Sequence, residues 1–222
     1  MFFVHHRVEA APRSWAAVAE RLAKAKLDGG TVYGVWRSQI GRPRDELQVM
    51  TLWTRETKAA AAENALLGSA ADVRHVRSQA LVPTLRPTDG TAPTRQGNYA
   101  FRWFATPQAH WPEFLQLCTD AWPGFESAYD SQVIGLWQAT GDRTGADGDD
   151  ATGAGIHGGV RSLLMTRRPN LAMWERSKLP SGAAEADVRD KLSRRYDLCD
   201  WTVVSTSTLI TAADTQDTAR WT

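Results

Sequence analysis

Two stretches of the chain are nearly the same: VYGVWRS at residues 32–38 and VIGLWQA at residues 133–139. In each, a glycine precedes a tryptophan by two positions, within a run of β-branched and aromatic residues that is typical of a strand. Gly34 and Gly135 are 101 residues apart, and so are the two tryptophans that follow them. Self-similarity at this distance indicates an internal repeat.

The repeat extends in both directions from these strands. HHRVEAAPRSW at residues 5–15 parallels FRWFATPQAHW at residues 101–111, because each has a strand-like run, a proline and a tryptophan that opens a helical stretch. VMTLWTRE at residues 49–56 parallels LMTRRPN at residues 164–170. The spacing is longer in the second half, which predicts an insertion in the Gly- and Asp-rich residues 142–159.

Each half is predicted to run strand, helix, strand, strand, helix, strand. The predicted strands are 2–9, 31–40, 47–54 and 74–85, then 99–105, 133–140, 160–167 and 198–211. The predicted helices are 14–26 and 58–67, then 111–122, 170–177 and 185–196. This order is the ferredoxin-like βαββαβ unit. The predicted domains are an N-terminal unit (1–87), a linker (88–98), a C-terminal unit (99–213) with the insertion 142–159, and a tail (214–222).

The strands carry large side chains on both faces, although a four-stranded sheet of this kind has helices on one face only. Strict alternation along 31–40 gives two sets: Val32, Gly34, Trp36 and Ser38 on one face, and Tyr33, Val35 and Arg37 on the other. We therefore predict an α+β fold in which the bare sheet faces of the two tandem ferredoxin-like units meet, so that antiparallel sheets form one barrel-type core.

Composition excludes several classes of protein. The formal net charge of +1 argues against a nucleic-acid partner. No apolar run approaches the roughly 18 residues of a membrane helix, and the N-terminus lacks a signal-peptide pattern. Cys118 and Cys199 are far apart and read as free thiols in a reducing cytoplasm. We expect a cytoplasmic protein without a bound metal, and a homodimer stays open.

Three groups of residues carry a family resemblance: the GVW and GLW strands, DAWPGFE at residues 120–126, and TRRPNLAMWERS at residues 166–177. On these, the chain resembles the NIPSNAP family of the dimeric α+β barrel superfamily, in a fused-repeat form. The family supplies no catalytic motif to transfer. The superfamily includes cofactor-free monooxygenases, polyketide cyclases and haem enzymes, so the resemblance implies a fold and leaves the chemistry open.

The first predicted strand carries two adjacent histidines that must face opposite ways. If Val4, Val8 and His6 pack under the helices, His5 faces the barrel with Arg7 and Glu9. A buried histidine is suited to general base catalysis or to ligating a metal. The alternative is a structural histidine satisfied by a carboxylate such as Glu9.

Polar residues that are not repeated are the best candidates for catalysis: His5, Tyr33, Arg37 and Arg102. Tyr33 and Arg37 are expected to share a strand face. A buried arginine requires a carboxylate partner or an anionic ligand. Four of the ten tryptophans are candidates for lining a substrate pocket: Trp36, Trp53, Trp103 and Trp137. Core packing is the stronger alternative for the repeated pair.

Two tempting motifs in the insertion are rejected. GAGIHGG at residues 153–159 satisfies G-x-G-x-x-G, but it follows an acidic loop and leads into a strand, whereas a dinucleotide site needs a strand before it and a helix after it. The nearby Asp147, Asp149 and Asp150 lack the ligand spacing of a calcium loop.

The leading hypothesis is a barrel that binds a small apolar or aromatic molecule, with a cofactor-independent monooxygenase or cyclase as the candidate enzyme. The first alternative is a non-catalytic barrel, packed solid, that serves as a structural or protein-interaction module. The second alternative is a haem protein with His5 or His6 as axial ligand.

Overall fold

The computed structural model describes residues 1–68, 70–144 and 159–213. The first half contains β1 (Phe2–Ala10), α1 (Trp15–Ala23), β2 (Gly30–Ile40), β3 (Glu46–Trp53), α2 (Ala59–Leu67) and β4 (Val73–Pro83). The second contains β5 (Asn98–Pro107), a short 3-10 turn (Gln108–His110), α3 (Trp111–Tyr129), β6 (Gln132–Thr144), β7 (Gly159–Arg168), α4 (Leu171–Arg176), α5 (Ala183–Asp197) and β8 (Trp201–Leu209).

The strands form one closed antiparallel barrel in the order β1-β3-β2-β8-β5-β7-β6-β4. Each half contributes four neighbouring strands with its first strand in a central place, which is the ferredoxin-like arrangement. The halves join edge to edge at two seams, where β2 pairs with β8 and β4 pairs with β6. The predicted fold of two facing ferredoxin-like units is confirmed.

The repeated glycine marks a β-bulge that is also repeated. The register of β2 against β3 shifts between Val32 and Gly34, and that of β6 against β7 shifts between Val133 and Gly135. A bulge adds one residue and reverses the facing of the residues after it in the strand. Strict alternation along 31–40 was therefore wrong.

Each tryptophan of the repeat folds back over its own glycine. A methyl group on Gly34 would lie 2.4 Å from the Trp36 ring, and one on Gly135 would lie 2.4 Å from the Trp137 ring. Real Cβ atoms do not approach so closely, so only glycine fits at either position.

Each tryptophan also packs edge-on against the first strand of the other half. The ring centroids of Trp36 and Tyr99 are 5.8 Å apart at 63°, and those of Trp137 and Phe3 are 5.4 Å apart at 65°. Such edge-to-face pairs add to the energy of area burial. Each copy of the repeated strand therefore supplies a tryptophan that packs against the opposite half of the barrel.

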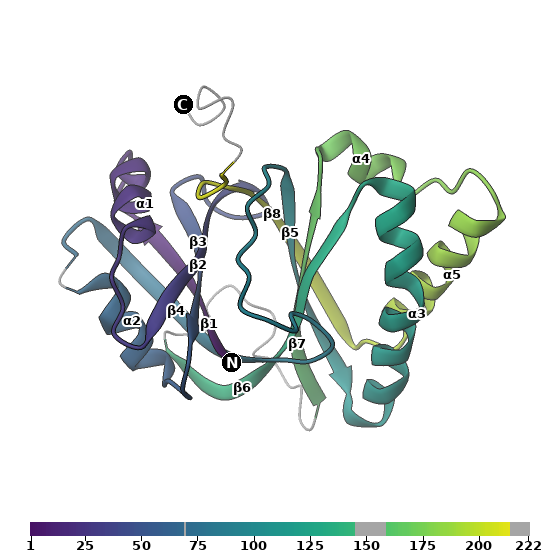
Figure 1. The fold of residues 1–222 in the computed structure, drawn as a ribbon, viewed down its shortest axis with the longest axis horizontal. Helices are drawn as coiled ribbons and strands as arrows, with labels where there is room; N and C mark the ends of the chain where they lie inside the picture. Colours follow the sequence, from purple (N-terminus) through teal and green to yellow (C-terminus); the bar gives the residue numbers. More distant parts are fainter. Residues whose placement is uncertain (69, 145–158, 214–222) are drawn as a thin grey trace.

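The helices cover the barrel on its two flanks, with α1 and α2 beside the first half and α3, α4 and α5 beside the second (Figure 1). Val8, Val35 and Val49 pack beneath α1, whereas a larger aromatic core lies beneath α3 and α5. No helix of the described residues is both long and apolar enough to cross a bilayer.

Two predicted helix ends were wrong. The first helix ends at Ala23 and not at residue 26. The third does not stop before Pro123 but continues to Tyr129. Proline removes one helical hydrogen bond, yet Phe125 and Tyr129 beyond it are buried in the core, and their burial stabilises the last turns.

The proposed domain boundaries at 87, 98 and 213 stay predictions. Residues 145–158 of the insertion, with the glycine motif at 153–158 and Asp147, Asp149 and Asp150, lie outside the described residues, as does the tail 214–222.

Candidate functional site

The interior of the barrel is filled by side chains from both halves. The largest of them are fully buried: Phe3, Trp36, Met50, Leu81, Tyr99, Phe101 and Trp137. The cavity beside His5 is lined mainly by polar side chains, among them Arg7 and Gln79, and has a volume of about 30 Å³. This is room for one or two water molecules, so the described barrel is packed rather than hollow.

His5 does face the barrel, as expected, but its partner is not Glu9. The His5 Nε2 atom lies 3.0 Å from Gln48 Oε1. The amide nitrogen of Gln48 donates to Ser207 Oγ at 2.9 Å and to Ser205 Oγ at 3.3 Å, so its oxygen is the atom left to accept from His5. If His5 has a structural role, its partner is therefore the amide of Gln48 and not the expected carboxylate.

His6 faces the helices, as the pattern predicted, and is fully buried. Its Nδ1 lies 2.8 Å from Ser78 Oγ and its Nε2 lies 3.1 Å from Thr51 Oγ1. Burial, with a smaller contribution from the charge of His5, lowers the pKa of His6 to about 3. His6 is therefore neutral at physiological pH.

The structure does not bring the four proposed catalytic residues together. His5 and Tyr33 point into the barrel. Arg37 lies on the outer face, with its guanidinium 3.8 Å from the centre of the Trp15 ring, because the bulge at Tyr33 separates the two residues that alternation had placed on one face. Arg102 is also on the outer face, over Tyr196. A single site made of all four is excluded.

Three of the four candidate tryptophans line the barrel: Trp36, Trp103 and Trp137. Trp53 does not, because the regular alternation of β3 turns it outward into a small core with Val4 and Ala59 beneath α2. Its indole N–H donates to Thr51 Oγ1 at 2.9 Å. The indole N–H groups of Trp36 and Trp137 are buried and have no hydrogen-bond partner among the described residues.

The Tyr33 mouth is the cavity lined by Tyr33, Ile134 and residues of the segment 85–95, and it has a volume of about 370 Å³. Charges around it are largely balanced within the protein. Arg86 donates to Glu126 at 2.8 Å, and Arg95 lies 3.8 Å from Asp130. Burial, together with the charge of Asp89, raises the pKa of Tyr33 well above its usual range, so its phenol stays protonated.

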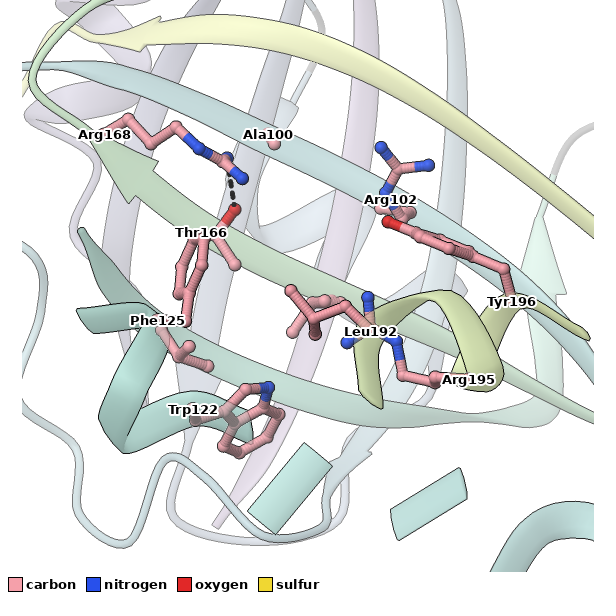
Figure 2. A pocket seen from close by; sticks show the side chains of 11 residues that line it. Ala100, Arg102, Trp122, Phe125, Thr166, Arg168, Leu192, Arg195 and Tyr196 are labelled. Carbon is pink, nitrogen blue, oxygen red and sulfur yellow. Dashed lines mark hydrogen bonds between the residues drawn. The ribbon is translucent and has the colours of Figure 1, made fainter. Parts of the chain in front are cut away.

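The arginine pocket is a second space, on the outer face of β5 and β7 beneath α5. Figure 2 shows that the guanidinium groups around it come from β5, β7 and α5, with Trp122, Phe125 and Leu192 closing its lower side. Its cations are Arg102, Arg168 and Arg195. Of these, only Arg102 was singled out from the sequence.

Arg168 and Arg195 were missed, although a signal was present for one of them. Arg195 lies on the buried stripe of α5 that Val188 begins, where an apolar residue is expected. An arginine on such a stripe indicates a buried charge that needs a carboxylate partner or an anionic ligand. Arg168 is the last residue of β7. It lies in the stretch TRRPNLAMWERS that carries the family resemblance, but nothing there marks it as part of a pocket.

The two histidines considered as haem ligands have hydrogen-bond partners within the protein. Both ring nitrogens of His6 are hydrogen-bonded within the core, and His5 Nε2 lies against Gln48 Oε1 beside a cavity of about 30 Å³. Haem binding stays a prediction from the sequence. Among the described residues, no three His, Cys, Asp or Glu side chains gather as a metal site.

Comparison with known proteins rests on structure alone. No family model matches the chain, and no curated protein sequence does. An anthrone oxidase-like protein superposes over 94% of this chain and 91% of its own, with a TM-score of 0.60 and 11% identity. A proposed monooxygenase from Lactobacillus acidophilus covers 95% and 96%, with a TM-score of 0.54 and 10% identity.

A variant of chlorite dismutase from Candidatus Nitrospira defluvii is also similar, over 94% of this chain and 90% of its own, with a TM-score of 0.55 and 10% identity. These likenesses show that the chain has the dimeric α+β barrel fold of monooxygenase-like and chlorite dismutase-like proteins. At such identities they carry the fold and not the activity.

Proposed function

We propose that the protein binds a small, flat apolar or aromatic molecule at the Tyr33 mouth, and that its reaction class is cofactor-independent oxygenation or cyclisation. The observation that carries the proposal is the position of the free space. The barrel interior is filled, and the space of about 370 Å³ lies at one end of it, against Tyr33. Pockets of this size suit a small organic molecule.

The chemistry of the mouth favours a neutral ligand. Its arginines, Arg86 and Arg95, are already paired with carboxylates, so they offer little to the charge of a ligand. Ile134, Pro87 and Pro93 supply apolar surface. The protonated phenol of Tyr33 is placed to donate a hydrogen bond to a ketone or phenolate oxygen.

A carboxylate at the same mouth completes a minimal acid–base pair. A hydrogen bond from the Thr91 backbone N–H lowers the pKa of Asp89, so this group is ionised at neutral pH. The lowered pKa also makes it a weak base, so the C–H bond of the ligand must itself be acidic. A ligand that loses a proton to Asp89 while Tyr33 stabilises the oxygen anion becomes electron-rich enough to react with molecular oxygen. This assignment replaces the dispersed set of four residues.

Anthrone is the probe of choice, because it is a flat ketone with an acidic C–H and because one structural neighbour is described as anthrone oxidase-like. We expect anthrone to change the tryptophan fluorescence of the protein and to raise oxygen uptake above the spontaneous rate. Binding without oxygen uptake removes the oxygenase assignment and keeps the binding function. No binding to this or to other flat aromatic ketones rejects both.

A non-catalytic barrel is the second candidate, and the packed interior is the observation that favours it. In that case the Tyr33 mouth binds a ligand, or the outer surface binds a partner protein, and no reaction is catalysed. Membership of the NIPSNAP family, a cytoplasmic location and a homodimer stay predictions from the sequence.

A further inference from the structure

Three arginines face the arginine pocket, and their contacts within the described residues include no carboxylate. Arg102 and Arg195 contact aromatic rings, and Arg195 Nη1 also lies 3.6 Å from Cys118 Sγ. Arg168 donates to Thr166 Oγ1 at 3.2 Å. In the described part of the chain, no Asp or Glu lies within ion-pairing distance of these three guanidinium groups. The Nε atoms of Arg168 and Arg195 are buried and lack a hydrogen-bond partner in that same part of the chain.

Two other arginines of this protein are each neutralised by a carboxylate. Arg7, inside the barrel, forms a two-pronged pair with Glu46, with both N–O distances at 3.0 Å. Arg86, which is half-buried, pairs with Glu126 at 2.8 Å. An uncompensated buried charge is strongly destabilising. In the arginine pocket Arg195 is buried, and Arg102 and Arg168 are half-buried beside it. This concentration of positive charge without a carboxylate calls for an anion from outside the chain.

Aromatic side chains hold the guanidinium groups in place. Arg195 is stacked over Phe104 at 5.0 Å and over Tyr196 at 5.1 Å, and Arg168 is stacked over Phe125 at 4.9 Å. Such contacts fix orientation and contribute some energy. They leave the positive charge in place, so the donors are arranged before an anion arrives.

The pocket has an inner and an outer part. The inner part, with a volume of about 40 Å³, is reached by all three arginines. The outer part, about 330 Å³, shares Arg102 and Arg168 with it and extends along Trp174 and Thr202. Two further cations, Lys178 and Arg189, also line the outer part. A small charged group fits the first, and an organic body fits the second.

We propose that the arginine pocket binds a small organic phosphate, with the phosphoryl group held by Arg102, Arg168 and Arg195 and the organic part lying in the outer space against Trp174. Guanidinium forks match the oxygens of phosphate in pairs. A carboxylate would offset one of the three charges, whereas a phosphate monoester dianion offsets about two.

The electrostatics of the neighbouring groups agree with an excess of positive charge. Burial lowers the pKa of Arg168 to about 10. For Tyr196 burial acts in the opposite sense, yet the charges of Arg195, Arg102 and Arg168 outweigh it and lower the pKa of the phenol. An anion in the pocket would relieve both effects.

The test compares three probes at constant ionic strength and about pH 8, where a phosphate monoester is a dianion. Phenyl phosphate, inorganic phosphate and benzoate are titrated by calorimetry and by thermal unfolding. We expect phenyl phosphate to bind most tightly and to raise the unfolding midpoint with concentration, inorganic phosphate to follow, and benzoate to be weakest.

Arg168→Met and Arg102→Met are the test variants, and Arg194→Met is the control, since Arg194 is the exposed neighbour of Arg195 and pairs with Glu113 at 3.0 Å. We expect each test variant to lose roughly tenfold to a hundredfold in affinity for phenyl phosphate. Arg194→Met should bind as the parent does. Without phosphate, the unfolding midpoint of Arg168→Met should be unchanged or raised, because a half-buried charge without a carboxylate partner is gone.

Three outcomes would overturn the proposal. In the first, phenyl phosphate leaves the parent protein unaffected. In the second, benzoate binds as well as phenyl phosphate, which assigns the pocket to carboxylates. In the third, Arg168→Met and Arg102→Met are destabilised and bind phenyl phosphate as Arg194→Met does, which makes the arginines structural. None of these bears on anthrone binding at the Tyr33 mouth.

Discussion

The ring of His5 lies on the ring of Phe101, with centroids 5.6 Å apart and planes inclined at 28°. The two residues occupy matching places in the repeat, 96 positions apart. The same holds for their neighbours, because Gln48 matches Leu163 across the two halves. One half thus places a hydrogen-bonded polar pair where the other places an apolar pair, and the two meet inside the barrel.

We predict that His5→Phe destabilises the fold by roughly 1–3 kcal/mol, because the buried oxygen of Gln48 loses its donor. His5→Phe combined with Gln48→Leu copies the second half and should recover part of the loss. Urea unfolding of the two single variants and the double variant gives the coupling energy, expected at roughly 0.5–3 kcal/mol. Strictly additive effects would show that the pair does not act as a unit.

Gly34→Ala should cost roughly 1–3 kcal/mol, since the new methyl group would overlap the Trp36 ring unless the ring moves. Gly141→Ala is the matched control, because no atom of the described residues beyond its two chain neighbours lies within 4 Å of the added carbon there. Thermal or urea unfolding measures both. Adding Trp36→Leu to Gly34→Ala should remove the penalty of the methyl group itself, and a penalty that persists would locate the cause in the backbone.

The neutral state of His6 makes the fold sensitive to acid. Its folded pKa of about 3 lies below the value of 6.5 for a free histidine. Between these values the unfolded chain binds a proton that the folded chain does not, so stability falls as the pH falls from 6.5 towards 3. The slope from this group is about 1.4 kcal/mol per pH unit.

His6→Asn should flatten the stability curve over that window, at the cost of some stability at neutral pH. The control is His75→Asn, at an exposed position of β4. Urea unfolding at a series of pH values between 4 and 7 checks the slope, as its contribution is about 1.4 kcal/mol per unit. Equal slopes for the parent and His6→Asn would mean that other groups dominate.

Tyr33→Phe removes the proposed hydrogen-bond donor at the mouth and should weaken anthrone binding by about fivefold to tenfold, which corresponds to one hydrogen bond. Any enzyme-dependent oxygen uptake should fall further than binding does. Tyr129→Phe, which removes a phenol whose partner is Glu185 on α5, serves as control. Fluorescence titration and an oxygen electrode separate the two effects, and equal responses of both variants would remove Tyr33 from the site.

The fold could be predicted because the repeat encodes it at several levels. The two tryptophan strands, the parallel strand–helix segments and the insertion between matched strands all indicate two ferredoxin-like units. Which side chains meet was harder to predict, because one extra residue in a strand reverses the facing of every residue after it. The bulge at Tyr33 sent Arg37 to the helices, and nothing in the local composition announces it.

The candidate sites were predicted less well than the fold. His5 was placed on the correct face, whereas strict alternation put Tyr33 on the face opposite to Trp36, and both residues lie in the barrel. The rule that a buried arginine needs an anionic partner applies directly to Arg102. The pocket around it, however, forms only when β5, β7 and α5 come together, and its lining residues are up to 96 positions apart, from Ala100 to Tyr196. Such a convergence is a property of tertiary packing, and no single segment contains it.

Both seams of the barrel, β2 with β8 and β4 with β6, join strands of one polypeptide. Closing the barrel is therefore a unimolecular event, and the linker sets a high effective concentration for the two halves. Every position along the barrel wall also exists once. In a barrel of two identical chains a substitution alters two opposite walls together, whereas here it alters a single wall. Each side of the barrel can therefore be changed independently. Smaller side chains at His5 or Phe101 would create an asymmetric cavity, with no second copy of the substitution on the opposite side.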